Sequence, residues 1–220
     1  MDYFLLGRPV HSEDFSKDAH CLALRFARRI NIPAGYAKQT LRRFMGAAHS
    51  HAVRVLIAGL DSAGKTTVLF KLHRGEKRKD EHVSTIPTMD FNVMQWKHKR
   101  KTFSVWDVGG QDAMRPLWRH HYTGTQGLIY VIDSNDVHRM AKASEELHKI
   151  MLDQAMRDVC LLVYANKTDL PQALTVQQVS DQLQLEQLGV RAYHVQPSVA
   201  RTGEGLWQGL KWLAANVRKL

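Results

Sequence analysis

Short apolar runs alternate along the chain with longer segments in which apolar residues recur at helical spacing. Each run is short enough to form one buried strand. The runs cover residues 52–58, 102–107, 127–133, 159–165 and 191–196. The helical segments cover residues 66–72 and 137–152, and a last one with the core stripe Leu206, Leu210, Leu213 and Val217.

Strands that alternate with helices indicate the α/β class, with a mainly parallel sheet that helices cover on both faces. Ligands of such sheets bind at the carboxyl ends of the strands. Motifs that carry chemistry should therefore fall directly after the predicted strands, and three of them do.

The first motif is Gly-Leu-Asp-Ser-Ala-Gly-Lys-Thr, directly after the first predicted strand and at the start of a helix. It fits the phosphate-loop pattern, in which backbone N–H groups and a helix N-terminus surround phosphate oxygens. We expect Lys65 to reach the outer phosphates and the Thr66 hydroxyl to bind Mg²⁺. Taken alone, the motif also fits a structural glycine turn. The phosphate-binding residues predicted here are Gly59, Asp61, Ser62, Ala63, Gly64, Lys65, Thr66 and Thr67.

The second motif, Trp-Asp-Val-Gly-Gly-Gln at residues 106–111, ends a predicted strand on an acid. Asp107 is placed to hold the metal through a water, and Gly110 to offer its N–H to a terminal phosphate. Gln111 is placed to orient an attacking water. A simple strand-end turn would explain the acid and the glycines, but not their match to the phosphate loop on a neighbouring strand.

The third motif, Asn-Lys-Thr-Asp at residues 166–169, follows the fourth predicted strand. The Asp169 carboxylate can accept two hydrogen bonds from guanine that adenine cannot donate, so it would select GTP over ATP. We expect Asn166 to bind the base and brace the phosphate loop, and the Lys167 stem to cover the ring. The Ala200 N–H would meet the guanine carbonyl. Outside this context, the tetrapeptide would also fit a plain turn.

The charge is strongly positive and unevenly spread. The 220-residue chain has a formal charge of +10, and residues 19–60 contain seven Arg or Lys and no acid. Such a stretch favours an anionic partner, which could be a membrane surface, a nucleic acid or a targeting receptor. A solvated tail is the alternative. We expect no nucleic-acid binding, because the stretch lacks interleaved aromatic residues. Two distant cysteines form no disulfide framework, and no apolar run is long enough to span a bilayer.

With these motifs in this order, the chain resembles the ADP-ribosylation factor (Arf) family of small GTPases over about residues 53–217. The resemblance implies a P-loop small GTPase fold with a six-stranded, mainly parallel sheet. It also implies a GDP/GTP switch that recruits coats, tethers and lipid enzymes to membranes. It rests on the phosphate loop and on residues 85–88, 91–93, 106–112, 115–120, 122–127, 133–136 and 165–171.

Several residue roles are implied by this resemblance alone. Thr88 would join Thr66 on Mg²⁺ when the third phosphate is present, and Gln111 would be the hydrolytic glutamine. The family has no arginine finger of its own, so slow turnover is implied, with an activating protein and an exchange factor as partners. Effectors of the family read an exposed aromatic triad, so we expect exposed rings at Phe91, Trp106 and His121, which match it here with His in place of the usual Tyr. The alternative for Phe91 and Trp106 is plain sheet packing.

Two departures from the family pattern concern the cycle and the N-terminus. Asp90 replaces a glycine beside a segment that must slide during switching, so we expect Asp90→Gly to raise GTP affinity or exchange rate. Met-Gly at residues 45–46 resembles the family's myristoylated start, but it lies inside the chain, so a lipid on Gly46 would require a start at Met45. If Met1 is the start, residues 37–45 predict a short basic amphipathic helix. A mitochondrial presequence fits less well, because acids lie near Met1.

We therefore expect a basic, partly disordered extension over residues 1–51 and an Arf-type GTPase domain over 52–220. The predicted function is a monomeric GTP-binding switch in vesicle-mediated membrane traffic, which uses GTP/GDP and Mg²⁺. It would be cytoplasmic and peripherally attached to Golgi, endosomal or plasma membranes, with coat or other traffic effectors. The alternative is a hydrolysis-impaired module that binds partners with its nucleotide locked in place.

Overall fold

The computed structural model describes residues 52–78, 83–88, 91–189 and 192–218. The chain divides into two units, Met1–Ser50 and His51–Leu220, and the account below concerns the second. None of the helices in the described ranges is both long and apolar enough to cross a membrane.

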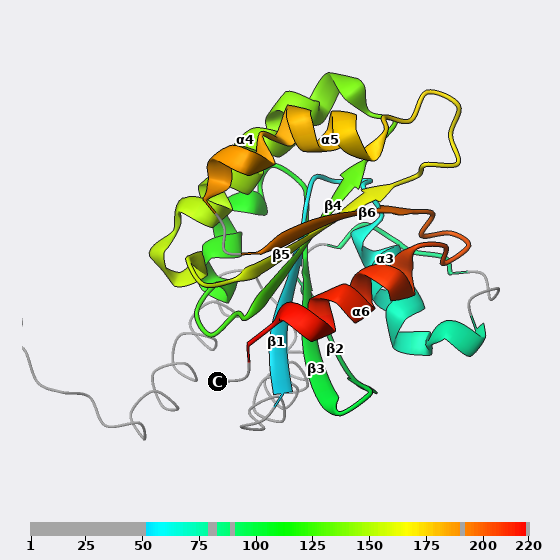
Figure 1. The fold of residues 1–220 in the computed structure, drawn as a ribbon, viewed down its shortest axis with the longest axis vertical. Coiled ribbons are helices and arrows are strands. Elements are labelled where there is room, and N and C mark those ends of the chain that lie inside the picture. Colours follow the sequence, from blue (N-terminus) through cyan, green and yellow to red (C-terminus); the bar gives the residue numbers. More distant parts are fainter. Residues whose placement is uncertain (1–51, 79–82, 89–90, 190–191, 219–220) are drawn as a thin grey trace, which may run out of the picture. The chain divides into compact units, whose positions relative to one another are not determined.

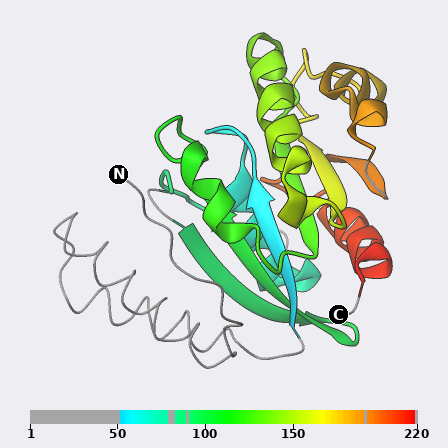
Figure 2. The same cartoon turned by 90° about the vertical axis from the view of Figure 1, so that its left-hand side faces the viewer.

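Six strands form one sheet in the order β2-β3-β1-β4-β5-β6 (Figure 1). Only β2 is antiparallel to its neighbour, and the β2–β3 hairpin makes one edge of the sheet (Figure 2). The predicted six-stranded, mainly parallel α/β fold is confirmed. The strands are β1 (Ala52–Ala58), β2 (Phe91–His98), β3 (Lys101–Val108), β4 (Gly127–Asp133), β5 (Cys160–Asn166) and β6 (Tyr193–Ser198).

The apolar pattern located five of these strands to within two residues and missed β2. Edge position explains the miss, because every residue of β2 is half-buried or exposed and its polar residues interrupt any apolar run. By contrast, β5 is buried along its whole length, as expected for a parallel strand that is covered on both faces.

Helices cover both faces of the sheet, as the alternation of strands and helices predicted (Figure 1). On one face α3 and α6 enclose a continuous core with alternate residues of the strands, such as Val55 and Ile57 of β1. On the other face α4 and α5 pack together. The α-helices of the described residues are α3 (Lys65–Arg74), α4 (Met140–Leu152), α5 (Val176–Leu183) and α6 (Leu206–Asn216). The same ranges contain five short 3₁₀ helices: η1 (Glu76–Arg78), η2 (Arg115–His121), η3 (Val137–Arg139), η4 (Gln154–Met156) and η5 (Leu185–Leu188).

Candidate functional site

The loop between β1 and α3 has the backbone shape that surrounds an anion. Gly59, Ser62 and Gly64 all have positive φ values, of 138°, 61° and 100°. A Cβ on Gly59 would lie 2.3 Å from the Val131 carbonyl oxygen, so only glycine fits where the loop passes β4. Gly64 is followed at once by α3, which directs the N-terminus of that helix at the loop. The predicted phosphate cradle is therefore present in the backbone.

Lys65 is buried beneath this loop. Its Nζ donates a hydrogen bond to the Leu60 carbonyl at 2.7 Å, and only 6% of the residue is exposed. Burial lowers the pKa of Lys65 to about 8, although the nearby carboxylates of Asp107 and Asp61 oppose the shift. A Cβ on Gly110 would lie 2.3 Å from the Lys65 Nζ, so the two predicted phosphate-binding residues are in close contact. The Lys65 ammonium group is therefore placed to bind a terminal phosphate.

Three oxygen-bearing side chains meet beside Lys65. The Thr66 Oγ1 lies 2.9 Å from the Thr88 Oγ1 and donates to the Asp107 Oδ2 at 2.8 Å. Asn92 Nδ2 donates to the same carboxylate oxygen at 3.3 Å. Burial raises the pKa of Asp107, while the hydrogen bond from Thr66 and the charge of Lys65 act against this rise. Residues from three separate segments thus form one small polar centre.

This centre fits the magnesium ion that the sequence predicts. The second carboxylate oxygen of Asp107, Oδ1, is buried and has no hydrogen-bond partner in the described ranges. Oxygen ligands of this kind, completed by waters and phosphate oxygens, are what Mg²⁺ prefers. Among the described residues, no cluster of three or more His, Cys, Asp or Glu could hold a metal. An ion bound here would therefore depend on hydroxyl, water and phosphate oxygens.

Asn166 connects the predicted base site to the phosphate loop. Its Nδ2 donates to the Ala63 carbonyl at 2.8 Å, and its Oδ1 accepts from the Ala200 N–H at 2.8 Å. The predicted brace on the phosphate loop is therefore present. The Ala200 N–H was predicted to meet guanine, but here it donates to Asn166, because that oxygen lies within reach of it.

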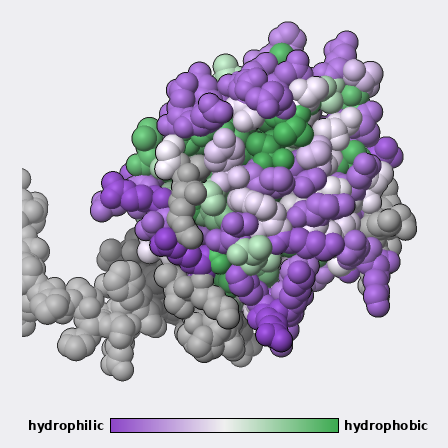
Figure 3. Space-filling view, viewed as in Figure 1, coloured by the Kyte–Doolittle hydropathy of each residue, from purple (hydrophilic) through white to green (hydrophobic). Residues whose placement is uncertain are grey.

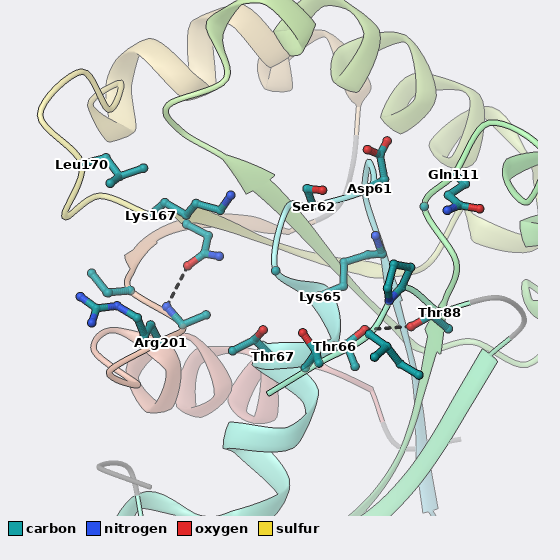
Figure 4. Close-up of a pocket in the computed structure, with 18 of the residues that line it drawn as sticks. Asp61, Ser62, Lys65, Thr66, Thr67, Thr88, Gln111, Lys167, Leu170 and Arg201 are labelled. Carbon is teal, nitrogen blue, oxygen red and sulfur yellow. Dashed lines mark hydrogen bonds between the residues drawn. The ribbon is translucent and has the colours of Figure 1, made fainter. Parts of the chain in front are cut away.

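The other two base-site residues carry ion pairs. The Lys167 Nζ lies 2.6 Å from the Asp133 Oδ2, which holds the lysine stem across the end of β5. Asp169 lies 3.5 Å from the Arg201 guanidinium. Lys167 and Arg201 both line this end of the pocket, and Figure 4 shows their side chains on either side of the hydrogen bond between Asn166 and Ala200.

A single cavity of about 520 Å³ joins the phosphate and base sites, a volume within the range of small-molecule pockets. Its walls include nearly all the predicted nucleotide-binding residues: Asp61, Ser62, Gly64, Lys65, Thr66, Thr67, Thr88, Gly110, Gln111, Asn166, Lys167, Asp169 and Ala200 (Figure 4). Gly59, Ala63 and Asp107 do not line it. They act from behind the wall, where Gly59 allows the loop to turn, the Ala63 carbonyl accepts from Asn166, and Asp107 binds Thr66.

Two arginines that the sequence reasoning did not assign bind the acid of the phosphate loop. Arg139 Nη1 lies 2.9 Å from the Asp61 Oδ1, and Arg115 Nη2 lies 3.5 Å from the same oxygen. Arg115 also donates through Nε to the Gly110 carbonyl at 2.9 Å, so it links the loop to the segment of Gln111. Spacing along the chain gave no indication of these contacts, although Arg115 lies within one of the family motifs.

The aromatic triad is assembled, but it is not equally exposed. The ring centroids of Phe91, Trp106 and His121 lie between 5.3 and 5.6 Å from one another. Trp106 is only 2% exposed, because the two other rings and the guanidinium of Arg54, 4.1 Å from its ring centroid, cover it. Burial and the charge of Arg54 lower the pKa of His121 to about 4, so this imidazole is neutral at neutral pH. The expectation of three exposed rings does not hold for Trp106.

Some sequence predictions fall outside the described residues. These are Asp90, the Met-Gly dipeptide at residues 45–46 and the amphipathic helix predicted over residues 37–45. They stay predictions.

The model of the ADP-ribosylation factor family matches residues 38–217, most of the chain. The chain belongs to the ADP-ribosylation factor family. It is also similar to the Arl6 BBS3 small GTPase from Trypanosoma brucei, solved with the bound nucleotide analogue GppNp. The match has 27% sequence identity and a TM-score of 0.66, and it covers 74% of this chain and 96% of that one. As an Arf-family small GTPase, the chain is a nucleotide-dependent switch that binds GTP and GDP and hydrolyses GTP. Proteins of this family generally use exchange factors, activating proteins and effectors.

Proposed function

We propose that the GTP form of this chain recruits coat or other effectors in vesicle-mediated traffic, at a Golgi, endosomal or plasma membrane surface. The observation that carries the proposal is the meeting of Thr88 with Thr66 and Asp107. Thr88 comes shortly before β2, which begins with Phe91 of the aromatic triad. A change at the phosphate end is therefore only three residues away from the proposed effector surface.

The residues of the site divide the chemistry among them. Lys65 and the N–H groups of the phosphate loop bind the phosphates, and the N–H of Gly110 faces the terminal one. Thr66 and Thr88, and Asp107 through a water, would hold Mg²⁺, which when bound would supply positive charge to neutralise the phosphates. Gln111 lines the pocket at the phosphate end and orients the attacking water (Figure 4). Arg115 and Arg139 are both bound to Asp61, so an activating protein would supply the missing arginine and hydrolysis without it would be slow.

The switch itself follows from the position of Thr88. With a third phosphate bound, the Thr88 hydroxyl would be held at the metal site beside Thr66 and Asp107, which would fix the start of β2. After hydrolysis, that contact is lost and the segment is released. Phe91, Trp106 and His121 then change their exposure together, because their rings contact one another.

Single-turnover hydrolysis of GTP, with and without an Arf-type activating protein, tests this proposal. We expect slow intrinsic hydrolysis, strong stimulation, and loss of stimulation in Gln111→Leu. Gln187→Leu in η5, an exposed glutamine far from the pocket, is the matched control and should behave as the wild type. No stimulation of the wild type, with normal GTP binding, would instead identify the chain as a hydrolysis-impaired interaction module.

A further inference from the structure

Exposed basic residues gather on three elements at one end of the domain. We call this group the basic end. In residues 73–78, 91–106 and 206–218 the only acid is Glu76. The corresponding part of the surface is strongly hydrophilic where the β2–β3 hairpin ends (Figure 3). The basic end consists of the exposed residues Arg74, Lys77, Lys97, Lys99, Arg100, Lys211 and Arg218.

Direct contacts hold these three elements together. His73 at the end of α3 packs edge-on against Trp96 of β2, with ring centroids 6.1 Å apart. On the other side, the Lys101 Nζ donates to the Ala214 and Val217 carbonyls, at 2.6 and 3.1 Å, which fixes the hairpin to the end of α6. Between them lies His98, whose pKa is lowered by burial and by the charges of Lys99 and Lys211. The basic residues therefore form one surface.

Four of the basic side chains of this surface, on the hairpin and on α6, have no ion-pair partner within the described ranges. None of Lys97, Lys99, Arg100 and Lys211 makes an ion pair with a described carboxylate there. On α4 the situation is the opposite, since Lys142 and Lys149 are both paired with Glu145 and Glu146, at 2.6 to 3.3 Å. Paired charges on a helix face contribute little field at a distance, whereas unpaired like charges add up. The basic end is thus the part of the described domain that is suited to a large anionic partner.

The basic end lies away from the nucleotide-binding pocket. Ala52, the first residue of β1, pairs with Thr102 at the start of β3, so the chain before Ala52 joins the domain at this end. Figures 1 and 2 both show the start of β1 close to the hairpin and to the end of α6. The pocket lies at the carboxyl ends of the same strands, where Lys65 and Gln111 line it. A flat partner can therefore cover the basic end and leave the nucleotide accessible.

We propose that the basic end docks on the anionic headgroups of a lipid bilayer. The inference deepens the proposed membrane function and rests on it for the choice of partner. A bilayer fits because the charge is spread over the exposed ends of three elements rather than gathered in a cleft. RNA fits less well, since the aromatic rings near this surface already have packing partners. Trp96 packs against Phe103 and His73, and Trp212 stacks on His194.

Sedimentation of the full chain with vesicles tests the proposal. The vesicles contain either phosphatidylcholine alone or phosphatidylcholine with about one third phosphatidylserine. The test variant carries Lys97→Gln, Lys99→Gln and Arg100→Gln. The control variant carries Lys142→Gln, Lys149→Gln and Arg157→Gln, which removes the same charge around α4. GDP affinity is measured for every preparation, so a failure of the nucleotide site is seen separately.

We expect the wild type and the control variant to bind the anionic vesicles, and the test variant to bind them roughly 100-fold more weakly, since each lost charge weakens binding about fivefold. Raising the salt to about 0.5 M should release the wild type. Equal loss in both variants, equal binding to vesicles without phosphatidylserine, or full binding by the test variant would each overturn the proposal. So would binding of an RNA oligonucleotide or an acidic peptide in preference to the vesicles.

Discussion

A single amide side chain, that of Asn166, joins the two halves of the nucleotide site. Both of its polar atoms are used, by the Ala63 carbonyl and by the Ala200 N–H, and the residue is only 2% exposed. In Asn166→Ala these two buried groups lose their partner. We expect a loss of about 2–4 kcal/mol in the free energy of unfolding, together with faster GDP release.

Urea unfolding and the rate of GDP dissociation measure these two effects. Asn216→Ala is the control, because Asn216 donates only to the Trp212 carbonyl at the end of α6. That variant should lose about 1 kcal/mol or less and release GDP normally. If both variants behave alike, the bridge between the loops has no special role.

The buried Lys65 predicts proton uptake when nucleotide binds. Its pKa in the free protein is lowered to about 8, and phosphate next to it favours the charged form. Above pH 8, binding must therefore take up a proton, and GDP affinity should fall as the pH rises, by up to tenfold per unit.

Titration calorimetry of GDP from pH 7 to about 9.5, in two buffers of different ionisation enthalpy, measures that uptake. Lys65→Arg stays charged over this range, so its weaker affinity should be independent of pH. A wild-type affinity that does not change with pH would show that Lys65 is already charged before nucleotide binds.

Most residues of the site could be predicted from sequence because each motif is continuous and follows a strand. The contacts of Asp61 could not, since its partners Arg115 and Arg139 are 54 and 78 residues away along the chain. The burial of Trp106 has a similar cause, because Arg54 and His121, which cover it, come from other elements. Sequence motifs identify groups, whereas tertiary packing decides how exposed those groups are.

At the scale of elements, helix α6 packs against β5 through a glycine. A Cβ on Gly209 would lie 2.6 Å from the Tyr164 ring, whose hydroxyl donates to the Leu206 carbonyl at 2.6 Å. Alanine normally stabilises a helix relative to glycine, by about 1 kcal/mol. In Gly209→Ala we expect the opposite sign, a net loss of about 1–3 kcal/mol, because the buried ring must move.

Urea unfolding measures this change, and Gln208→Ala on the exposed side of the same helix is the control, with an expected effect within about 0.5 kcal/mol. Stabilisation of Gly209→Ala would mean that the contact with Tyr164 is loose.

Elements were predictable where burial made their pattern strong. The edge strand β2 and helix α5 did not stand out, because β2 is half-exposed and α5 shows only Val179 and Leu183 buried. Local chemistry still explains where α5 begins. Thr175 and Gln178 form a capping box, with the Gln178 N–H donating to the Thr175 hydroxyl at 3.2 Å.

At the scale of the whole molecule, ligand binding should control stability. Nucleotide binds only the folded site, so GDP with Mg²⁺ at about 1,000 times its dissociation constant should add about 4 kcal/mol. For a domain of this size, that raises the melting temperature by about 8–16 °C. Chelation of Mg²⁺ by EDTA should remove most of this gain, because the polar centre of Thr66, Thr88 and Asp107 would lose its ion.

Thermal unfolding with GDP, with GDP plus EDTA, and with ATP in place of GDP measures these changes. ATP should give little shift, because adenine cannot donate two hydrogen bonds to Asp169. An equal shift with ATP would contradict the assignment of the base site.

The pairing of Asp61 has a consequence for communication across the protein. The Asp61 carboxylate is shared by Arg115, which lies four residues after Gln111, the proposed hydrolytic glutamine, and by Arg139, which ends η3 directly before α4. If the segment of Gln111 moves during the cycle, Arg115 moves with it, and Arg139 is left as the main counter-charge of Asp61. Movement of the Gln111 segment would therefore change the electrostatic environment of Arg139 at the start of α4, because both arginines contact the same Asp61 oxygen.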